Sequence, residues 1–295
     1  ICIIGCGLIG SSLAKAIKKN NISELIVSSN RSDWVNKKVI ELKIVDEASE
    51  DTKKMVKGSD LIIIAAPLSS YKGIILKIKN SFQDGAILTD VGSVKERVTN
   101  LVEKNIPKNI SWIPSHPIAG TEDSGPESGF AELFINRWCI LTPSTKAKKS
   151  DIKLLEKFWK KIGSKVDIMD TKKHDYILSI TSHLPHLIAY NIVSTSLNIQ
   201  EKKETDIVKY SAGGLRDFTR IAASNPIMWR DIFIENKKNT IKMIDDFIKN
   251  LENLKQAIEN EDGKKLEKIF NKTKKIRKEI IQAGQDVEKP DFGRK

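Results

Sequence analysis

The sequence predicts an α/β fold in which an N-terminal domain built on a parallel sheet is followed by an all-helical C-terminal domain. Two patterns support this prediction. Within the first half of the 295 residues, short apolar runs alternate with helical patterns, as in strands joined by crossover helices. Beyond about Asp151, apolar residues recur mainly at the three- and four-residue spacing of helices. We therefore expect domains at residues 1–150 and 151–295.

Seven short apolar runs are the predicted strands. In chain order they cover residues 1–4, 25–28, 61–66, 86–89, 111–114, 138–141 and 165–168. Helices are predicted at residues 8–19 and, after the fourth strand, up to about residue 103. With 40% hydrophobic and 30% charged residues, the chain can bury a sizeable core. No apolar run approaches the ~18 residues of a membrane-spanning helix, so we expect no membrane partner.

The net charge of +12 raises the question of nucleic-acid binding. The lysines are spread through helical segments, however, and no aromatic residues are interleaved with them. This pattern favours a solvated lysine-rich surface, which attracts small anions, and we expect no nucleic-acid partner.

The cysteine pattern bears on the compartment. The three cysteines are odd in number and show no Cys-x-x-Cys spacing, which argues against a disulfide framework or a zinc site. We therefore expect a cytoplasmic protein.

Two apolar stripes mark the C-terminal helices. The first comprises Ile241, Ile244, Phe247, Ile248, Leu251, Leu254 and Ile258, and the second comprises Leu266, Ile269, Phe270, Ile276 and Ile280. Such stripes are usually covered by ordinary helix packing. Two long stripes in one helical domain also suit an interface between two copies, so we expect a homodimer.

A glycine-rich turn, Gly5-Cys-Gly-Leu-Ile-Gly10, directly follows the first predicted strand and opens the first helix. Gly5 permits a tight turn, Gly7 lets a pyrophosphate approach the backbone, and Gly10 lets helix and strand pack closely. The helix N-terminus, which includes Leu8 and Ile9, offers free N–H donors and the positive end of the helix dipole. The first domain is therefore predicted to be a Rossmann-type dinucleotide-binding domain.

The choice of cofactor depends on the end of the second strand, where NAD enzymes usually carry a carboxylate for the ribose 2′-hydroxyl. Here Asn30, Arg31 and Ser32 occupy this stretch, and the first carboxylate is Asp33. Arg31 and its polar neighbours would hold a 2′-phosphate through charge-assisted hydrogen bonds. We therefore expect NADP to be favoured over NAD; the alternative is that Arg31 is a solvated turn residue. The expected cofactor-binding residues are Gly5, Gly7, Leu8, Ile9, Gly10, Asn30, Arg31, Ser32, Ala66 and Pro67.

Three of the four histidines lie in two short motifs, His116-Pro-Ile-Ala-Gly-Thr-Glu122 and Ser182-His-Leu-Pro-His186. Histidine has its ordinary pKa closest to neutral pH, so it is the usual proton-transfer group. His116 follows the predicted strand at 111–114, and ligands of open α/β sheets bind outside the carboxyl ends of strands. Ser93 follows the strand at 86–89 in the same way, and it either bonds the same substrate group or caps the next helix.

The second histidine motif places Ser182 and His186 four residues apart, so both can point from one helix face into one cleft. A metal site at His183 and His186 would lack a cysteine or carboxylate ligand at suitable spacing, so no metal is expected.

Arg216 and Arg220 are also four residues apart. An arginine fork fits a carboxylate bidentately, which makes this pair a candidate for substrate binding. The alternative is a surface arginine that pairs with Asp217 or Asp231.

Six segments together resemble the prephenate/arogenate (cyclohexadienyl) dehydrogenase family of tyrosine biosynthesis. In chain order they are GCGLIGSS, DVGSVK, HPIAGTEDSG, SHLPH, GGLRDFTRIA and NPIMWRDI, and they span essentially the whole chain. The pairing of HPIAGTE with SHLPH is much more specific than the glycine motif. Two departures are Ser11, where the family often has glycine, and Asn30, where an acidic residue is common.

The resemblance implies roles for eight residues. His116 would be the catalytic histidine that bonds the substrate C4 hydroxyl, and Ser93 would help to orient that hydroxyl and the nicotinamide. Arg220 would grip a substrate carboxylate. The other matches line the substrate pocket or its entrance: Ser182, His186, Thr121, Glu122 and Trp229.

The implied reaction is the oxidative decarboxylation of prephenate to 4-hydroxyphenylpyruvate, or of arogenate to tyrosine, with hydride transfer to NAD(P)+. Because the ring becomes aromatic as CO₂ leaves, the protein need only position the ring and accept one proton. The two substrates differ in a keto versus an amino group, so the preference between them stays open. Two other functions also stay open: a two-domain dehydrogenase of 3-hydroxy acids, which we would expect to use a lysine base, and a non-catalytic NADP-sensing protein.

Overall fold

The structure is a computed structural model that describes residues 1–121, 123–203 and 208–280. The chain forms two compact units, residues 1–240 and residues 241–295, and the second is described up to residue 280. No helix in these described stretches is long and apolar enough to cross a membrane.

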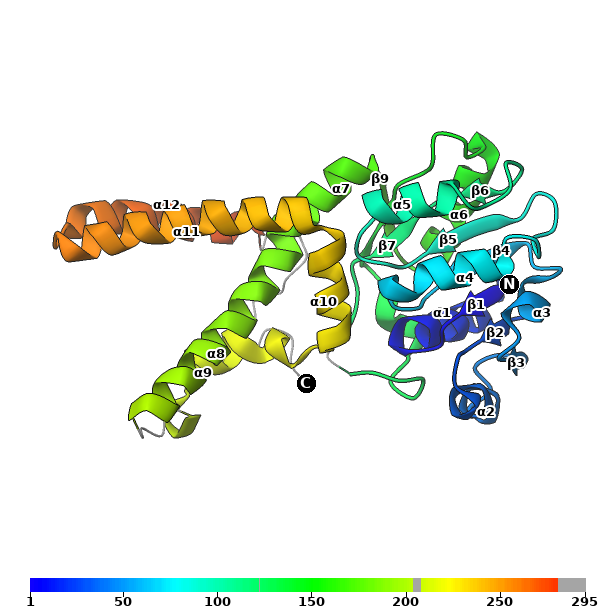
Figure 1. Ribbon diagram of the computed structural model, residues 1–295, viewed down its shortest axis with the longest axis horizontal. Helices are drawn as coiled ribbons and strands as arrows, with labels where there is room; N and C mark the ends of the chain where they lie inside the picture. Colours follow the sequence, from blue (N-terminus) through cyan, green and yellow to red (C-terminus); the bar gives the residue numbers. More distant parts are fainter. Residues whose placement is uncertain (122, 204–207, 281–295) are drawn as a thin grey trace. The chain divides into compact units, whose positions relative to one another are not determined.

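A six-stranded parallel sheet forms the centre of the first unit (Figure 1). Its strands are β1 (Cys2–Ile4), β2 (Val27–Ser29), β3 (Glu47–Ser49), β4 (Leu61–Ile64), β5 (Ile87–Asp90) and β6 (Ser111–Trp112). They lie in the order β3-β2-β1-β4-β5-β6, and every neighbouring pair is parallel. The predicted Rossmann-type α/β fold is confirmed. The strand order reverses between β1 and β4, where such sheets bind their ligands.

Helices cover both faces of this sheet because successive strand residues point to opposite sides. Ile3 and Ile63 belong to one apolar core, whereas Ile4 and Ile64 belong to the other. The helices α1 (Leu8–Lys19), α2 (Asp33–Glu41) and α6 (Lys149–Lys161) contribute to the first core. The helices α3 (Thr52–Val56), α4 (Tyr71–Ile78) and α5 (Glu96–Glu103) contribute to the second. Burial of these two apolar layers is the main stabilising term of the domain.

A second, three-stranded sheet contains β7 (Ser115–Pro117), β8 (Trp138–Leu141) and β9 (Lys165–Ile168). β7 is antiparallel to β8, and β8 is parallel to β9. The strand predicted at 111–114 is therefore wrong in extent: β6 ends at Trp112, and the chain enters the second sheet at Ser115. Pro114 lies at this change of sheet, and it has no N–H to offer to a ladder. β9 lies beyond residue 150, yet it pairs with β8, which lies before that residue. The predicted domain boundary between residues 150 and 151 stays a prediction.

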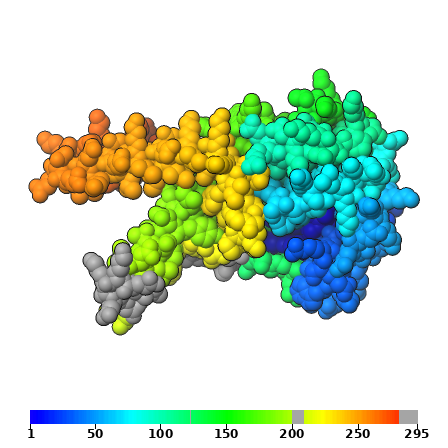
Figure 2. Space-filling view, in the orientation of Figure 1, coloured from blue at the N-terminus to red at the C-terminus, as the bar shows by residue number. Residues whose placement is uncertain are grey.

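The remainder of the first unit is helical. After β9 come α7 (Thr171–Leu178), the π-helical turn η3 (Ser179–His183), α8 (Leu184–Lys203), α9 (Gly213–Thr219), the 3₁₀ turn η5 (Arg220–Ala223) and α10 (Pro226–Glu235). Asn225 caps α10 by accepting hydrogen bonds from the backbone N–H groups of Ile227 and Met228. Asp231 of α10 accepts a hydrogen bond of 3.1 Å from the Ser69 N–H, which joins α10 to the turn η1 (Leu68–Ser70). Figure 2 shows α10 in yellow beside the cyan surface of this region.

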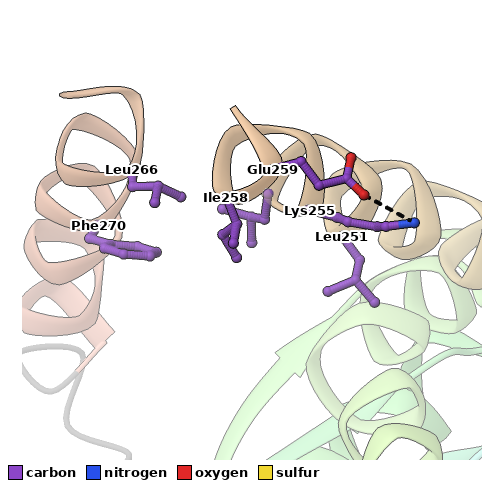
Figure 3. Close-up of a pocket in the computed structure, with 7 residues that line it drawn as sticks. Leu251, Lys255, Ile258, Glu259, Leu266 and Phe270 are labelled. Atoms are coloured by element: carbon purple, nitrogen blue, oxygen red, sulfur yellow. Dashed lines mark ion pairs between the residues drawn. The ribbon is translucent and has the colours of Figure 1, made fainter. Parts of the chain in front are cut away.

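The second unit consists of most of α11 (Lys237–Glu259) together with α12 (Gly263–Ile280). Both predicted apolar stripes lie on these helices. Figure 3 shows Leu251 and Ile258 of α11 and Leu266 and Phe270 of α12 around an apolar hollow of about 420 Å³. At its rim, Lys255 Nζ lies 3.5 Å from a carboxylate oxygen of Glu259.

Candidate active site

The glycine turn after β1 has the backbone geometry of a phosphate cradle. Gly5 has φ +99°, a left-handed conformation that favours glycine, and a Cβ at Gly10 would lie 2.0 Å from the Gly5 carbonyl oxygen. The space above Gly7 is open, and no side chain caps the N-terminus of α1. The N–H groups of the first helical turn have no partner inside the helix, so they are available to a pyrophosphate. The residues present therefore fit a dinucleotide.

The glycine turn also packs against the end of β4. A Cβ at Gly5 would lie 2.6 Å from the Ala65 carbonyl oxygen and 3.1 Å from the Ala66 nitrogen. Ala66 is partly buried there, and Pro67 is exposed beside it. The predicted cofactor residues that follow β1 and β4 therefore meet where the strand order reverses.

The end of β2 divides the remaining predicted cofactor residues into two groups. Asn30 is buried: its Oδ1 accepts a hydrogen bond of 2.6 Å from the Cys6 N–H, and its Nδ2 donates to Ser28 and Asn36. The amide oxygen thus holds the glycine turn through Cys6, and the amide nitrogen is bonded to Ser28 and Asn36. Arg31 and Ser32 are exposed.

The nearest carboxylate beyond this stretch already has a partner. Asp33 Oδ2 lies 2.7 Å from Lys37 Nζ on the exposed surface of α2. The lysine offsets the negative charge of Asp33, so this carboxylate does not prevent an anionic group from lying beside Arg31.

His116 lies on β7 and is buried, with 8% of its surface exposed. Its Nδ1 is 2.8 Å from Nε2 of His174 on α7, and Nδ1 of His174 is 2.8 Å from a carboxylate oxygen of Asp175. Burial holds the pKa of His116 well below its usual value, and the neighbouring His174 and Lys95 charges lower it further. An imidazole of this kind is unprotonated at neutral pH and can accept a proton.

A buried ion pair lies beneath His116. Lys95 Nζ donates to both carboxylate oxygens of Asp90, at 2.8 and 2.7 Å, and to the Ser115 carbonyl oxygen at 2.7 Å. Asp90 also accepts hydrogen bonds from the Ser115 and Gly92 N–H groups and from the Tyr71 hydroxyl. Burial lowers the pKa of Lys95, and the Asp90 charge opposes this change. The pair therefore ties the end of β5, the Ser93 loop and β7 together.

Ser93 lies in this loop and is partly buried. The competing role, a cap for α5, is filled by Asp175, whose carboxylate accepts the N–H groups of Lys95 and Glu96. Val94, the next residue, packs against Trp229 and Ile232 of α10. The loop that carries Ser93 is thus in contact with the helical part of the first unit.

The SHLPH segment and Trp229 form the helical side of the candidate site. The rings of His186 and Trp229 stack with centroids 3.7 Å apart and an interplanar angle of 23°. His186 Nδ1 donates a hydrogen bond of 2.9 Å to the Ser182 carbonyl oxygen, which leaves Nε2 as the acceptor nitrogen. Burial lowers the pKa of His186, and the charge of Arg220 adds to this effect. Ser182 lies in the π-helical turn η3, a distortion that is frequent at functional sites.

Thr121, Glu122 and Arg216 are the remaining candidates for substrate binding, and the described contacts do not join Thr121 or Arg216 to His186 or Trp229. Thr121 is exposed, and its Oγ1 accepts a hydrogen bond from the Asp123 N–H. Glu122 lies outside the described residues. Arg216 forms an ion pair with Asp217 at 3.1 Å, as the alternative for this arginine pair suggested.

His183, between the two motif residues, faces the interior. Asn236 Nδ2 lies 3.1 Å from His183 Nδ1, and burial lowers the pKa of His183 to about 4. Within the described ranges, no group of three or more histidine, cysteine or acidic residues could hold a metal ion.

Sequence reasoning missed two residues of this site, His174 and Asp175. His174 is the fourth histidine, and the signal that could have drawn attention to it is an adjacent carboxylate at a helix start, Thr171-Lys-Lys-His-Asp175. Both side chains are buried; His174 contacts His116, and Asp175 contacts His174.

Comparison with known proteins supports what this geometry suggests. Residues 13–168 match the family model described as prephenate dehydrogenase, nucleotide-binding domain, and residues 170–272 match prephenate dehydrogenase, dimerization domain. The chain belongs to the prephenate dehydrogenase family. Members of this family are oxidoreductases with a nucleotide-binding domain, so the chain is a dehydrogenase that uses NAD or NADP.

Three relatives show the extent of the match. The chain is 37% identical to a cyclohexadienyl dehydrogenase of Zymomonas mobilis over 94% of each chain. It is 32% identical to a prephenate dehydrogenase of Bacillus subtilis, over 94% of this chain and 75% of that one. It superposes on the crystal structure of prephenate dehydrogenase from A. aeolicus in complex with hydroxyphenyl propionate and NAD+ with a TM-score of 0.89 and 35% identity, covering 95% and 97% of the two chains.

Proposed function

We propose that this family member catalyses the oxidative decarboxylation of prephenate or arogenate, with hydride transfer to NAD(P)+. The observation that carries this proposal is His116, a buried histidine on β7, just beyond the carboxyl end of β6, whose Nδ1 is bonded to His174 and whose Nε2 remains to accept a proton. The family match and the dinucleotide cradle after β1 support it.

Each residue of the candidate site has a proposed role in this reaction. Nε2 of His116 accepts the proton of the C4 hydroxyl, and Ser93 holds that hydroxyl by a hydrogen bond. Arg220 binds a substrate carboxylate, while Ser182, His186 and Trp229 shape the pocket around the ring. A bound nicotinamide supplies the acceptor for the hydride from C4. With the hydride and the proton removed, the ring carboxylate leaves as CO₂ and its electron pair completes the aromatic ring. The phenolate oxygen that results takes a proton back from His116, so the products are 4-hydroxyphenylpyruvate or tyrosine, CO₂ and NAD(P)H.

The test is a two-by-two assay of the purified protein. Prephenate and arogenate are each mixed with NAD+ or NADP+, and the absorbance of the reduced nicotinamide is followed together with CO₂ release. We expect both signals, in equal amounts, with at least one substrate. Turnover of a simple 3-hydroxy acid instead would favour the other dehydrogenase class. Tight cofactor binding with no turnover of any of these compounds would favour a sensing protein.

We propose that NADP is the preferred cofactor, because Arg31 is an exposed cation at the end of β2 and the nearest carboxylate, Asp33, is paired with Lys37. Arg31→Ala should weaken NADP binding about ten- to a hundredfold and leave NAD almost unchanged, since one bond to an ionised group contributes ~1.5–3 kcal/mol. Lys153→Ala removes an exposed lysine of α6 and is the control for a general loss of positive charge. Dissociation constants for both cofactors decide the question; a tenfold preference for NAD in the unmodified protein would contradict the proposal.

Arg220 is proposed to bind the substrate carboxylate, because it lies close enough to His186 to affect the pKa of that ring. Arg220→Gln should raise KM about ten- to a hundredfold with a smaller change in kcat, since it removes a bond to an ionised group that is made before the reaction. Arg216→Gln, in the same segment, is the matched control and should leave KM near its original value. The opposite result for the two variants would show that Arg216 is the substrate ligand.

We also propose that the protein is a homodimer. The match of residues 170–272 to a family model described as a dimerization domain supports this proposal. Several apolar side chains of α11 and α12 are about half exposed within the second unit: Ile241, Ile248, Leu251, Ile258, Phe270, Ile276 and Ile280. A partner that covers these side chains would remove a large apolar surface from water.

A further inference from the structure

A chain of hydrogen bonds runs from Nδ1 of His116 through His174 to Asp175, and the steps of the proposed reaction assign no role to His174 or Asp175. It passes from His116 Nδ1 to His174 Nε2, and from His174 Nδ1 to the Asp175 carboxylate, with both distances 2.8 Å. The carboxylate also accepts the backbone N–H groups of Lys95 and Glu96, at 2.8 and 2.9 Å, at the start of α5. His174 and Asp175 are almost wholly buried, with 0% and 2% of their surfaces exposed.

The direction of each bond in this chain follows from the Asp175 end. An ionised carboxylate can only accept hydrogen bonds, so Nδ1 of His174 must carry a proton. A neutral His174 then presents a lone pair at Nε2, and that lone pair requires a proton on Nδ1 of His116. With its one proton on Nδ1, His116 has its lone pair on Nε2.

The opposite direction would require a neutral Asp175 carboxyl group. Two backbone N–H donors at a helix N-terminus stabilise the ionised form, and the Lys95 ammonium lies on the same side. Burial lowers the pKa of both imidazoles; Lys95 and His183 add to this effect at His116, and Lys95 does so at His174, where Asp175 and Asp90 oppose it. The imidazole pair is therefore neutral before the reaction.

We infer that His174 and Asp175 are positioning residues that hold His116 in the tautomer whose Nε2 accepts the substrate proton. This inference rests on the proposed function only in the final step, the use of Nε2 as the base. The tautomer itself is a property of the free protein and can be measured without substrate.

Two variants of His174 separate its two hydrogen bonds. The amide nitrogen of asparagine can replace Nδ1 and keep the bond to Asp175, but asparagine does not reach His116. The longer glutamine side chain can place its amide oxygen near the position of Nε2 and accept the Nδ1–H of His116. We expect His174→Asn to lower kcat about ten- to a hundredfold with little change in KM, and His174→Gln to recover most of this loss.

A spectroscopic measurement tests the tautomer directly. The chain has four histidines, so ¹⁵N-labelled imidazole signals can be assigned by substitution. In the unmodified protein at neutral pH, His116 should show a protonated Nδ1 and an unprotonated Nε2. His174→Asn should convert His116 to a mixture of tautomers, and His174→Gln should keep the original one. NADPH affinity and the unfolding midpoint report whether each variant is folded.

The outcomes distinguish this inference from the proposed function. If the unmodified protein turns over neither prephenate nor arogenate but His116 shows the expected tautomer, the proposed function fails and the structural inference stands. If folded His174→Asn retains both full kcat and the original His116 tautomer, the inference is overturned. Equal losses in folded His174→Asn and His174→Gln, with His116 in its original tautomer in both, would also overturn it, because His174 would then act through packing alone.

Discussion

His116→Asn is expected to lower kcat by a factor of about 10² to 10⁴, the usual contribution of a general base. The amide nitrogen of asparagine can still donate to Nε2 of His174, so the polar chain behind the site keeps its partner. What is lost is the lone pair on Nε2 that accepts the substrate proton. Steady-state kinetics with saturating cofactor measure the effect, and turnover within about threefold of the unmodified protein would contradict this role.

The pH profile gives a second measurement for the same variant. Because burial and the adjacent His174 and Lys95 charges lower the pKa of His116, the base stays unprotonated as the pH falls below 6.5, the ordinary histidine value. In the unmodified protein, kcat/KM should therefore fall only at a pH below that value. This fall in kcat/KM at low pH, which we assign to protonation of His116, should be absent from the residual activity of His116→Asn. Cofactor affinity serves as the control for folding, since the glycine turn is unaffected.

Lys95→Met is expected to destabilise the protein by about 3–5 kcal/mol, because it leaves the Asp90 carboxylate buried without its cation. Both side chains of this pair are fully buried, and Lys95 also holds the Ser115 carbonyl oxygen next to His116. Urea unfolding at neutral pH measures the change in the free energy of unfolding.

Two further variants make this experiment specific. Lys37→Met removes one partner of an exposed ion pair and should leave the unfolding midpoint nearly unchanged. The double variant Lys95→Met, Asp90→Asn removes the orphaned charge and should recover part of the lost stability. A Lys95→Met protein that unfolds at the same midpoint as Lys37→Met would show that the buried pair contributes little.

Much of the sheet could be predicted because a buried parallel strand is a short, continuous apolar run. β1 and β4 have such runs and were predicted within two residues of their observed ends. β3 was missed because Glu47-Ala-Ser49 contains no apolar run; it lies at the edge of the sheet, where less burial is required. The change of sheet between β6 and β7 could not be predicted, because it depends on the strands with which each segment pairs: β6 pairs with β5, and β7 pairs with β8.

In the candidate site, sequence motifs identified the residues whose role depends on their own backbone conformation or on the reactivity of their own side chain. The glycine turn needs only the conformations of neighbouring residues, and His116 is the first residue of its own motif, on strand β7. Asn30 has a further role that the sequence did not predict: its side chain holds Cys6, which lies 24 residues away, and this contact exists only when β1 and β2 pair. Arg31 and Ser32 remain as the exposed candidates for a 2′-phosphate.

The sequence alone was thus sufficient to predict the fold class, the dinucleotide cradle and His116 as the candidate base, since each prediction depends on residues that lie close together in sequence. Folding in three dimensions is needed to turn His116 into a base of defined tautomer. Its partner His174 is 58 residues away, and Asp175 meets the Lys95 backbone across 80 residues. Such contacts leave no pattern in a single sequence, because a hydrogen bond between distant residues is set by how sheets and helices pack.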